Sequence, residues 1–231
     1  MTILSICQAA IKEVGSFNVP SYFVGNEDPT ARQILAQCDM VGKRLAQSDW
    51  TDLLVEYTFP TVASTATYSL PTDYDRFVNA SWWDGTEYEP LVGPTTSRDW
   101  QMLKRSVSAP SGVDTYFRIR AGLFEIFPTP TSVRTIAFEY YSKNWVIANG
   151  DTDATKSSIT ADNDTPIFDE RLFIDGLKAL FLQSKSLPFD TEAGLYDSRL
   201  NRLLSNDGGA QIVRFGRGIR RRNLPETGFG I

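Results

Sequence analysis

The sequence predicts a mixed α+β protein: a helical bundle from N- and C-terminal helix pairs, with a central antiparallel β region inserted and an extended C-terminal arm. Three observations support this fold class. Apolar residues recur at three- and four-residue spacing near both ends of the 231-residue chain. The middle of the chain alternates aromatic and β-branched runs with turn residues. Residues 208–231 combine glycine, proline and arginine in a pattern that opposes both a helix and a long strand.

The first two predicted helices are marked by signals at their ends. Thr2 can cap the first and Gly15 can end it, whereas Asp28 and Pro29 supply a cap and a first-turn proline for the second. Between these signals the apolar residues fall at helical spacing: Ile3, Ile6, Cys7, Ala10, Ile11 and Val14, then Ala31, Ile34, Leu35, Cys38, Val41 and Leu45. Because Cys7 and Cys38 belong to these apolar faces, we expect two buried free thiols and no disulfide.

Residues 53–164 are predicted to form the antiparallel β region, with one short helix and a long loop. Ala121 and Gly122 fit a hairpin turn between two strands. Thr96 and Asp99 form a capping-box-like start for the short helix, which would reach about Arg105. The polar stretch 149–164 is predicted to be a long exposed loop. The expected strands lie within 56–59, 67–70, 76–83, 115–120, 123–127 and 134–141.

A second helix pair is predicted after this loop. Thr165 and Pro166 are expected to start a third helix that ends before Pro188, and a fourth is expected from about Asp190 to Leu204. Because each helix has one apolar face, we expect residues 1–52 and 165–207 to pack into one bundle. The inward residues would be Phe168, Leu172, Phe173, Leu177, Leu180 and Phe181, then Leu195, Tyr196, Leu200, Leu203 and Leu204.

Residue types that usually perform catalysis are scarce. The chain contains no histidine, which removes the commonest general base and transition-metal ligand. It also lacks the glycine-rich phosphate loops and the GxSxG elbow. Asp73 and Asp75 are expected to lie in a solvated turn and not to form a glycosidic acid–base pair. Trp82 and Trp83 suggest a stacking platform, but neighbours on a strand point to opposite faces, so one of them is expected in the core. We therefore predict no enzyme and no cofactor.

The acidic loop partly matches a calcium-binding loop. Asp151, Asp153, Thr155 and Asp162 fall at positions one, three, five and twelve of the motif. Position six, where the motif requires glycine for a sharp turn, is Lys156, and position twelve lacks the bidentate glutamate. We predict no metal site here.

The C-terminal arm, residues 208–231, differs in charge from the rest of the chain. Its five arginines and one glutamate give it a net charge of +4, so with −5 for the whole chain the remainder carries −9. Single apolar residues stand between the arginines, which a merely solubilising tail does not need. We interpret the segment as a binding arm, the alternative being a solvated tail. Its expected binding residues are Arg214, Phe215, Arg217, Ile219, Arg220, Arg221, Arg222, Leu224 and Phe229.

The order of these motifs resembles a known family. Two predicted helices and Trp50 precede the run from Tyr68 to Phe77, YSLPTDYDRF, and this resembles the strand-and-turn signature of head-to-tail adaptors of tailed bacteriophages, which include tail tubular A-like proteins. The run LFEIFPTP from Leu123, a further strand at Phe138, and the second helix pair are similar to the rest of that pattern. The resemblance spans about residues 2–204.

The resemblance implies a non-enzymatic virion structural protein at the head–tail junction, assembled in the host cytoplasm. Such a subunit forms a ring, commonly a dodecamer, below the portal protein, receives a tail or nozzle protein, and takes part in tail assembly and DNA ejection. Its arm would reach the portal, and genomic DNA would pass through an acidic lumen without specific binding. No apolar run approaches membrane-spanning length, so no membrane partner is expected.

Two further surfaces are predicted from the helices and strands. The helical bundle is expected to form the ring, with Ile167, Ile174 and Leu182 as interface residues because they lie off the main apolar stripe of the third helix. The β region is expected to face the tail, with Tyr88, Tyr141 and Trp145 as exposed aromatic contacts. Two other functions remain open: a nucleic-acid-binding protein that uses the arginines of the arm, and a baseplate or receptor-binding structural protein.

Overall fold

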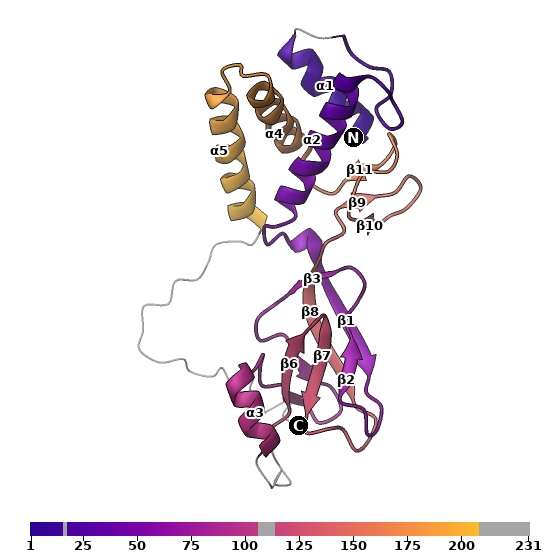
Figure 1. The fold of residues 1–231 in the computed structure, drawn as a ribbon, viewed down its shortest axis with the longest axis vertical. Coiled ribbons are helices and arrows are strands. Elements are labelled where there is room, and N and C mark those ends of the chain that lie inside the picture. The colour runs from indigo at the N-terminus through magenta and orange to yellow at the C-terminus, as the bar shows by residue number, and fades with distance from the viewer. Residues whose placement is uncertain (16–17, 106–113, 208–231) are drawn as a thin grey trace, which may run out of the picture.

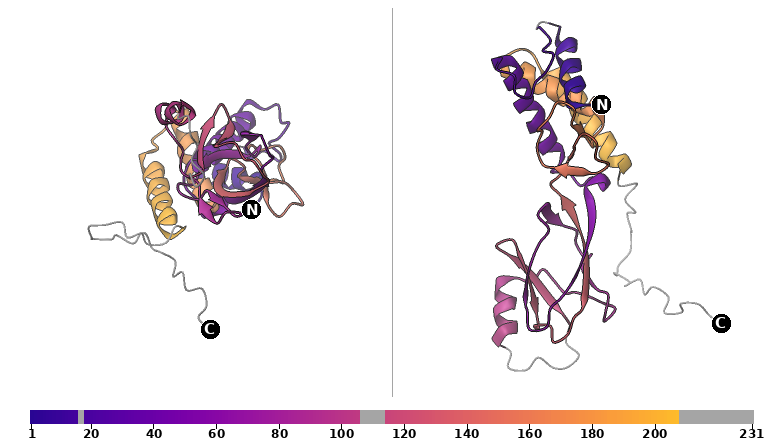
Figure 2. Two further views of the ribbon diagram at one scale, coloured as in Figure 1. Left: turned by 90° about the horizontal axis from the view of Figure 1, so that it is seen from below. Right: turned by 90° about the vertical axis from the view of Figure 1, so that its right-hand side faces the viewer.

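The computed structural model describes residues 1–15, 18–105 and 114–207. The described chain is elongated, with most of its helices at one end and most of its strands at the other (Figures 1 and 2). The two ends meet at a narrow waist, which the chain crosses on entering the strand-rich end after Leu53 and on leaving it after Ser142 (Figure 1). The predicted mixed α+β class is confirmed.

The helical end contains α1 (Ile3–Val14), α2 (Pro29–Leu45), α4 (Glu170–Ser184) and α5 (Asp190–Asp207). Helix α4 is central, because it packs against each of the other three. The predicted caps of α1 and α2 are confirmed: Thr2 accepts a hydrogen bond from the Ser5 N–H, and Asp28 accepts one from the Thr30 N–H. Gly15 ends α1 in the left-handed conformation, at φ 77°, which a residue with a Cβ rarely adopts.

One apolar core joins these helices to a small three-stranded sheet of β9 (Val146–Ile147), β10 (Ala154–Lys156) and β11 (Thr165–Pro166). Both cysteines lie in this core as free thiols, as predicted. Its buried residues are Ile3, Ile6, Cys7, Ala10, Ile11, Phe23, Ala31, Ile34, Cys38, Val41, Leu45, Trp50, Leu53, Trp145, Val146, Phe168, Leu172, Phe173, Ile174, Leu177 and Phe181.

The start of α4 differs from the prediction. Thr165 and Pro166 are not the first residues of a helix but form strand β11, paired with Ile147 and Val146 of β9. The helix begins at Glu170, where the Asp169 carboxylate accepts a hydrogen bond of 2.8 Å from the Leu172 N–H. A pairing partner about twenty residues away therefore prevails over the local helix signal.

The stretch 149–164 is also more ordered than predicted. It contains β10, and the part after it packs on the beginning of α1, where the Ile3 N–H donates to the Asp164 carbonyl at 2.8 Å. The Asp162 carboxylate accepts hydrogen bonds from the N–H groups of Phe23 and Val24. Asp164 is fully buried, so the expectation of a loop exposed along its whole length is wrong.

A short 3-10 helix, η1 (Thr51–Leu53), precedes the strand-rich end, which folds into two antiparallel sheets. In the larger sheet β1 (Leu54–Pro60), β8 (Thr135–Ser142), β4 (Trp83–Asp84) and β5 (Glu89–Pro90) are adjacent in that order, and β3 (Tyr74–Phe77) also pairs with β8. The second sheet orders β2 (Thr67–Ser69), β7 (Leu123–Phe127) and β6 (Tyr116–Arg120). The predicted single strand over 76–83 is two strands, because a turn with Ala80 at φ 61° separates β3 from β4.

Aromatic side chains from both sheets form a second core. Trp82 lies at its centre, with ring centroids 3.8 Å from Phe138 and 4.6 Å from Phe124. Trp83, by contrast, is 42% exposed, which confirms that only one member of the pair is buried. The predicted short helix is α3 (Ser97–Arg105), where the Asp99 N–H donates to the Thr96 hydroxyl. No helix within the described residues is long and apolar enough to cross a membrane.

Candidate interaction surfaces

The residues predicted for the arm lie outside the described part of the chain, but its root is described. Helix α5 ends at Asp207, whose carboxylate accepts hydrogen bonds from the Thr51 N–H at 2.6 Å and from the Thr51 hydroxyl at 2.7 Å. These bonds fix the end of α5 at the waist, beside η1 (Figure 1). The predicted arm residues Arg214, Phe215, Arg217, Ile219, Arg220, Arg221, Arg222, Leu224 and Phe229 therefore follow a root at the waist.

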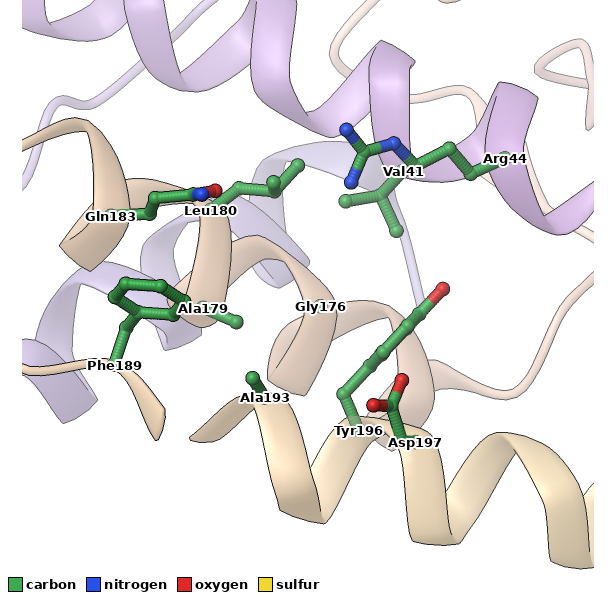
Figure 3. Close-up of a pocket in the computed structure, with 10 residues that line it drawn as sticks. All are labelled: Val41, Arg44, Gly176, Ala179, Leu180, Gln183, Phe189, Ala193, Tyr196 and Asp197. Carbon is green, nitrogen blue, oxygen red and sulfur yellow. The ribbon is translucent and has the colours of Figure 1, made fainter. Parts of the chain in front are cut away.

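Helix α5 is the most loosely covered of the helices, because none of its residues is fully buried. Gly176 of α4 allows the close approach of α5: a Cβ at this position would lie 2.7 Å from the Tyr196 ring. Beside this contact a pocket with about 520 Å³ of empty space, part of it open solvent, lies between α2, α4 and α5 (Figure 3). It has apolar walls and a polar rim, and is lined by Val41, Arg44, Gly176, Ala179, Leu180, Gln183, Phe189, Ala193, Tyr196 and Asp197.

An ion-pair network fastens α4 to its neighbours. Asp175 is buried, and its carboxylate pairs with Arg171 at 3.0 Å and with Arg199 of α5 at 2.9 Å. The Glu13 carboxylate of α1 forms ion pairs with Arg171 and with Lys178, the second at 2.9 Å. A hydrogen bond from Arg171 is the main reason why the pKa of Glu13 lies below its usual value, and Lys178 adds to that effect. Every charge in this network is paired, so its function is structural.

The three residues predicted for the ring interface do not lie on one surface. Ile174 is 4% exposed and belongs to the helical core, so the expectation that it is uncovered in a single subunit is wrong. The reason is that α4 is covered on several sides, by α1, α2 and α5. Leu182, near the end of α4, is half-buried. Ile167 is also half-buried but precedes α4 and lies at the waist.

The three aromatic residues predicted to face the tail have different surroundings. Trp145 is fully buried against Phe168 and Phe173, so it is not an exposed contact and the expectation is wrong. Tyr141 is half-buried, and the Arg76 guanidinium lies over its ring at 4.5 Å from the centroid. Tyr88 is 79% exposed, as expected.

Tyr88 lies at the end of the strand-rich region far from the waist, the end at which Pro60 of β1 pairs with Thr135 of β8. Val62 and Val133, 57% and 64% exposed, flank the hydrogen bond from the Thr61 N–H to the Arg134 carbonyl. The Arg134 side chain pairs with Glu87, the residue before Tyr88, at 3.7 Å. Tyr88 also has φ 60°, an uncommon conformation for a residue other than glycine. We call Val62, Tyr88 and Val133 the distal tip, a grouping that only the strand pairing reveals.

A groove with about 1250 Å³ of open space lies at the waist, where β1 and the end of β8 meet the small sheet of β9 to β11. Leu54 and Val55 on its wall are 37% and 36% exposed. We call it the waist groove; it is lined by Asp52, Leu54, Val55, Asp73, Ser142, Asn144, Ile147, Thr152, Asp153, Ala154, Pro166 and Ile167. None of these is basic. Sequence patterns gave no sign of the groove, because its walls come from segments about a hundred residues apart.

The acidic residues of the calcium-like loop serve the fold. Asp151 accepts a hydrogen bond from the Thr155 hydroxyl, and Asp162 binds backbone N–H groups of the loop before α2. Within the described ranges, no group of three or more histidine, cysteine, aspartate or glutamate residues is placed to hold a metal ion.

A comparison with protein families assigns the chain. The model of the SU10 adaptor protein family matches residues 1–222, which is nearly the whole chain and includes most of the arm. No curated protein matches the sequence. A match of this extent covers the helical end, the waist and the strand-rich end together. The chain therefore belongs to the SU10 adaptor protein family, a family of phage head-to-tail adaptors, in agreement with the resemblance seen in its sequence.

Proposed function

We propose that the protein is a ring subunit of a phage head-to-tail connector. About twelve copies attach below the portal protein, extend the DNA channel, and offer the attachment surface for a tail or nozzle protein. The ring is built in the host cytoplasm and stays in the virion. The main support is the family match over residues 1–222, combined with an elongated subunit whose arm is rooted at its waist.

We propose that residues 1–52 and 165–207 form the ring, with residues 53–164 projecting from it. Exposed apolar side chains on this end support the proposal: Met40 of α2 and Leu195 of α5 are 45% and 52% exposed. The pocket between α2, α4 and α5 has apolar walls that suit a side chain from a neighbouring copy (Figure 3). Leu182 stays a candidate for this interface, and Ile174 does not.

The charge distribution suits a channel for DNA. The proposed ring, residues 1–52 and 165–207, holds 13 acidic and 9 basic side chains, a net charge of −4, and residues 53–164 carry −5. A negative lumen repels DNA phosphates, so DNA can slide without being held by cations. In this proposal genomic DNA passes through the ring and binds nowhere specifically.

The distal tip is the proposed tail-facing surface. Changing Tyr88→Ser should leave the fold and portal attachment intact, because the side chain is 79% exposed, while reducing tail joining at least tenfold. The measurement is the fraction of heads that acquire tails when each purified protein is added to tailless particles. Tyr22→Ser, a change at a side chain 49% exposed on the helical end, is the control and should join tails normally. Normal tail joining by the Tyr88 variant would remove the tip from the interface.

Truncation tests the proposed arm. A chain ending at Asp207 keeps both described cores, so it should fold normally, yet it should fail to join portal-bearing heads. The apolar residues of the arm supply affinity that exposed ion pairs, worth at most about 1 kcal/mol each, do not. Full-length and truncated proteins are compared by co-sedimentation with DNA-filled capsids, and equal binding would contradict the proposal. A mobility shift of free DNA by the full-length chain alone would favour a nucleic-acid-binding function instead.

A further inference from the structure

The waist groove combines apolar walls with unpaired negative charge. Leu54, Val55 and Ile147 contribute apolar surface, and the first two are 37% and 36% exposed. Asp52 and Asp153 lie on its rim, are exposed, and form no ion pair with any described residue. Strand β1 adds an open edge, because among the described strands it pairs only with β8. A groove of this kind fits an extended segment that is both basic and apolar.

The chain itself contains such a segment. Residues 211–222, QIVRFGRGIRRR, contain five arginines and the apolar residues Ile212, Val213, Phe215 and Ile219, and no acid is present. The arm as a whole carries +4, opposite in sign to the groove. The first five residues of the segment, QIVRF, also contain the β-branched and aromatic residues that favour an extended strand.

The root of the arm lies next to the groove. Asp207 is hydrogen-bonded to Thr51, and the residue after Thr51 is Asp52 on the groove rim. Six residues separate Asp207 from Arg214, enough for an extended reach of about 20 Å. Because root and groove belong to one molecule, the effective concentration of the arm is in the millimolar range, so a contact with a dissociation constant below about 1 mM is occupied most of the time.

We propose that residues 211–222 of the arm dock in the waist groove of their own subunit before the protein meets its partners. The arginines face Asp52 and Asp153, and the apolar residues between them cover Leu54 and Val55. While the arm is docked, its arginines are not free to bind other anionic surfaces. A partner that binds the arm more tightly than the groove does releases them. This proposal does not depend on portal binding, and each of the two can be tested without the other.

The experiment uses a chain ending at Asp207 and a fluorescent synthetic peptide of residues 208–231. The anisotropy titration is made in low salt and repeated at high salt. The truncated chain should bind the peptide at one-to-one stoichiometry, more weakly at high salt, and the full-length chain should bind it at least tenfold more weakly because its groove is occupied. No binding to the truncated chain, or equal binding to both chains, would overturn the proposal. No portal is present, so the result is independent of the co-sedimentation experiment.

Matched variants locate the site. Asp52→Asn with Asp153→Asn should weaken peptide binding about tenfold, since two exposed charge pairs are removed. Glu27→Gln with Glu89→Gln removes the same charge from exposed positions outside the groove and should change the affinity less than twofold. Equal effects of the two pairs would show that only overall charge matters, which contradicts the proposal.

Peptide variants test the contacts without altering the folded chain. A peptide with its five arginines changed to glutamine and one with Ile212, Val213 and Phe215 changed to serine should each bind at least tenfold more weakly. Sedimentation of the full-length chain should show a single subunit at micromolar concentration. Concentration-dependent pairs that disappear on truncation would place the arm in the groove of a second copy and overturn docking within one subunit.

Discussion

Replacing Trp145 with alanine should lower the free energy of unfolding by about 3–5 kcal/mol, the cost of removing a large aromatic side chain from a packed core. Trp145 is fully buried, with ring centroids 5.8 Å from Phe173 and 6.2 Å from Phe168, and its indole N–H donates to the Ser157 carbonyl at 3.0 Å. Gly42 of α2 leaves room for the indole, because a Cβ at that position would overlap the ring. The residue joins α2, α4 and the strand segment after β8.

Urea unfolding followed by far-ultraviolet circular dichroism measures this loss. Trp83→Ala is the control, because this side chain is 42% exposed and its removal should cost less than about 1 kcal/mol. A loss below 1 kcal/mol for the Trp145 variant as well would mean that the indole is not part of the core. The same variant is no test of tail binding, because the buried indole offers no surface to a tail protein.

Replacing Asp164 with asparagine should cost about 2–4 kcal/mol, because a buried hydrogen-bonded charge is lost while its partners stay in place. The carboxylate is fully buried and accepts hydrogen bonds of 2.9 Å from the N–H groups of Thr160 and Ala161 and from the Lys156 ammonium. An asparagine amide would point a donor at this ammonium or at an N–H group. The loop after β10 would then lose its hold on the beginning of α1.

The loss should depend on pH. Burial alone raises the pKa of the Asp164 carboxyl, but the two N–H groups and Lys156 outweigh it and hold the pKa below its ordinary value. The carboxylate therefore contributes its full stability above its unfolded pKa of about 3.9, and the contribution is lost as the pH falls through the lower folded pKa. The stability difference between wild type and Asp164→Asn should be largest near neutral pH and shrink below about pH 4.

Urea titrations at several pH values test this dependence, with Glu27→Gln as an exposed control of the same charge change. The control should stay within about 0.5 kcal/mol of wild type near neutral pH. A difference for Asp164→Asn that stayed constant from neutral pH to pH 3 would show that the carboxylate contributes no charge-dependent stability.

The sequence alone determined the local features of this protein. The start and end of α1 were predicted from Thr2 and Gly15, and the start of α2 from Asp28 and Pro29, because capping depends on residues within one helical turn. The hairpin of β6 and β7 and the start of α3 were predictable for the same reason. The adaptor family was also recognisable from the sequence, because the order of these local motifs along the chain resembles the pattern of that family.

Tertiary structure alone decided which residues are covered and which surfaces meet. Helical periodicity assigned Ile174 to an outer face, but α4 is enclosed by three helices, so a side chain off the main stripe is buried as well. Thr165 and Pro166 pair with β9, and Trp145 packs between α2 and α4, through contacts that join distant parts of the chain. The distal tip and the waist groove likewise exist only once the strands have paired. Spacing along the chain records which face a residue occupies within its own element, but not which neighbours cover that face.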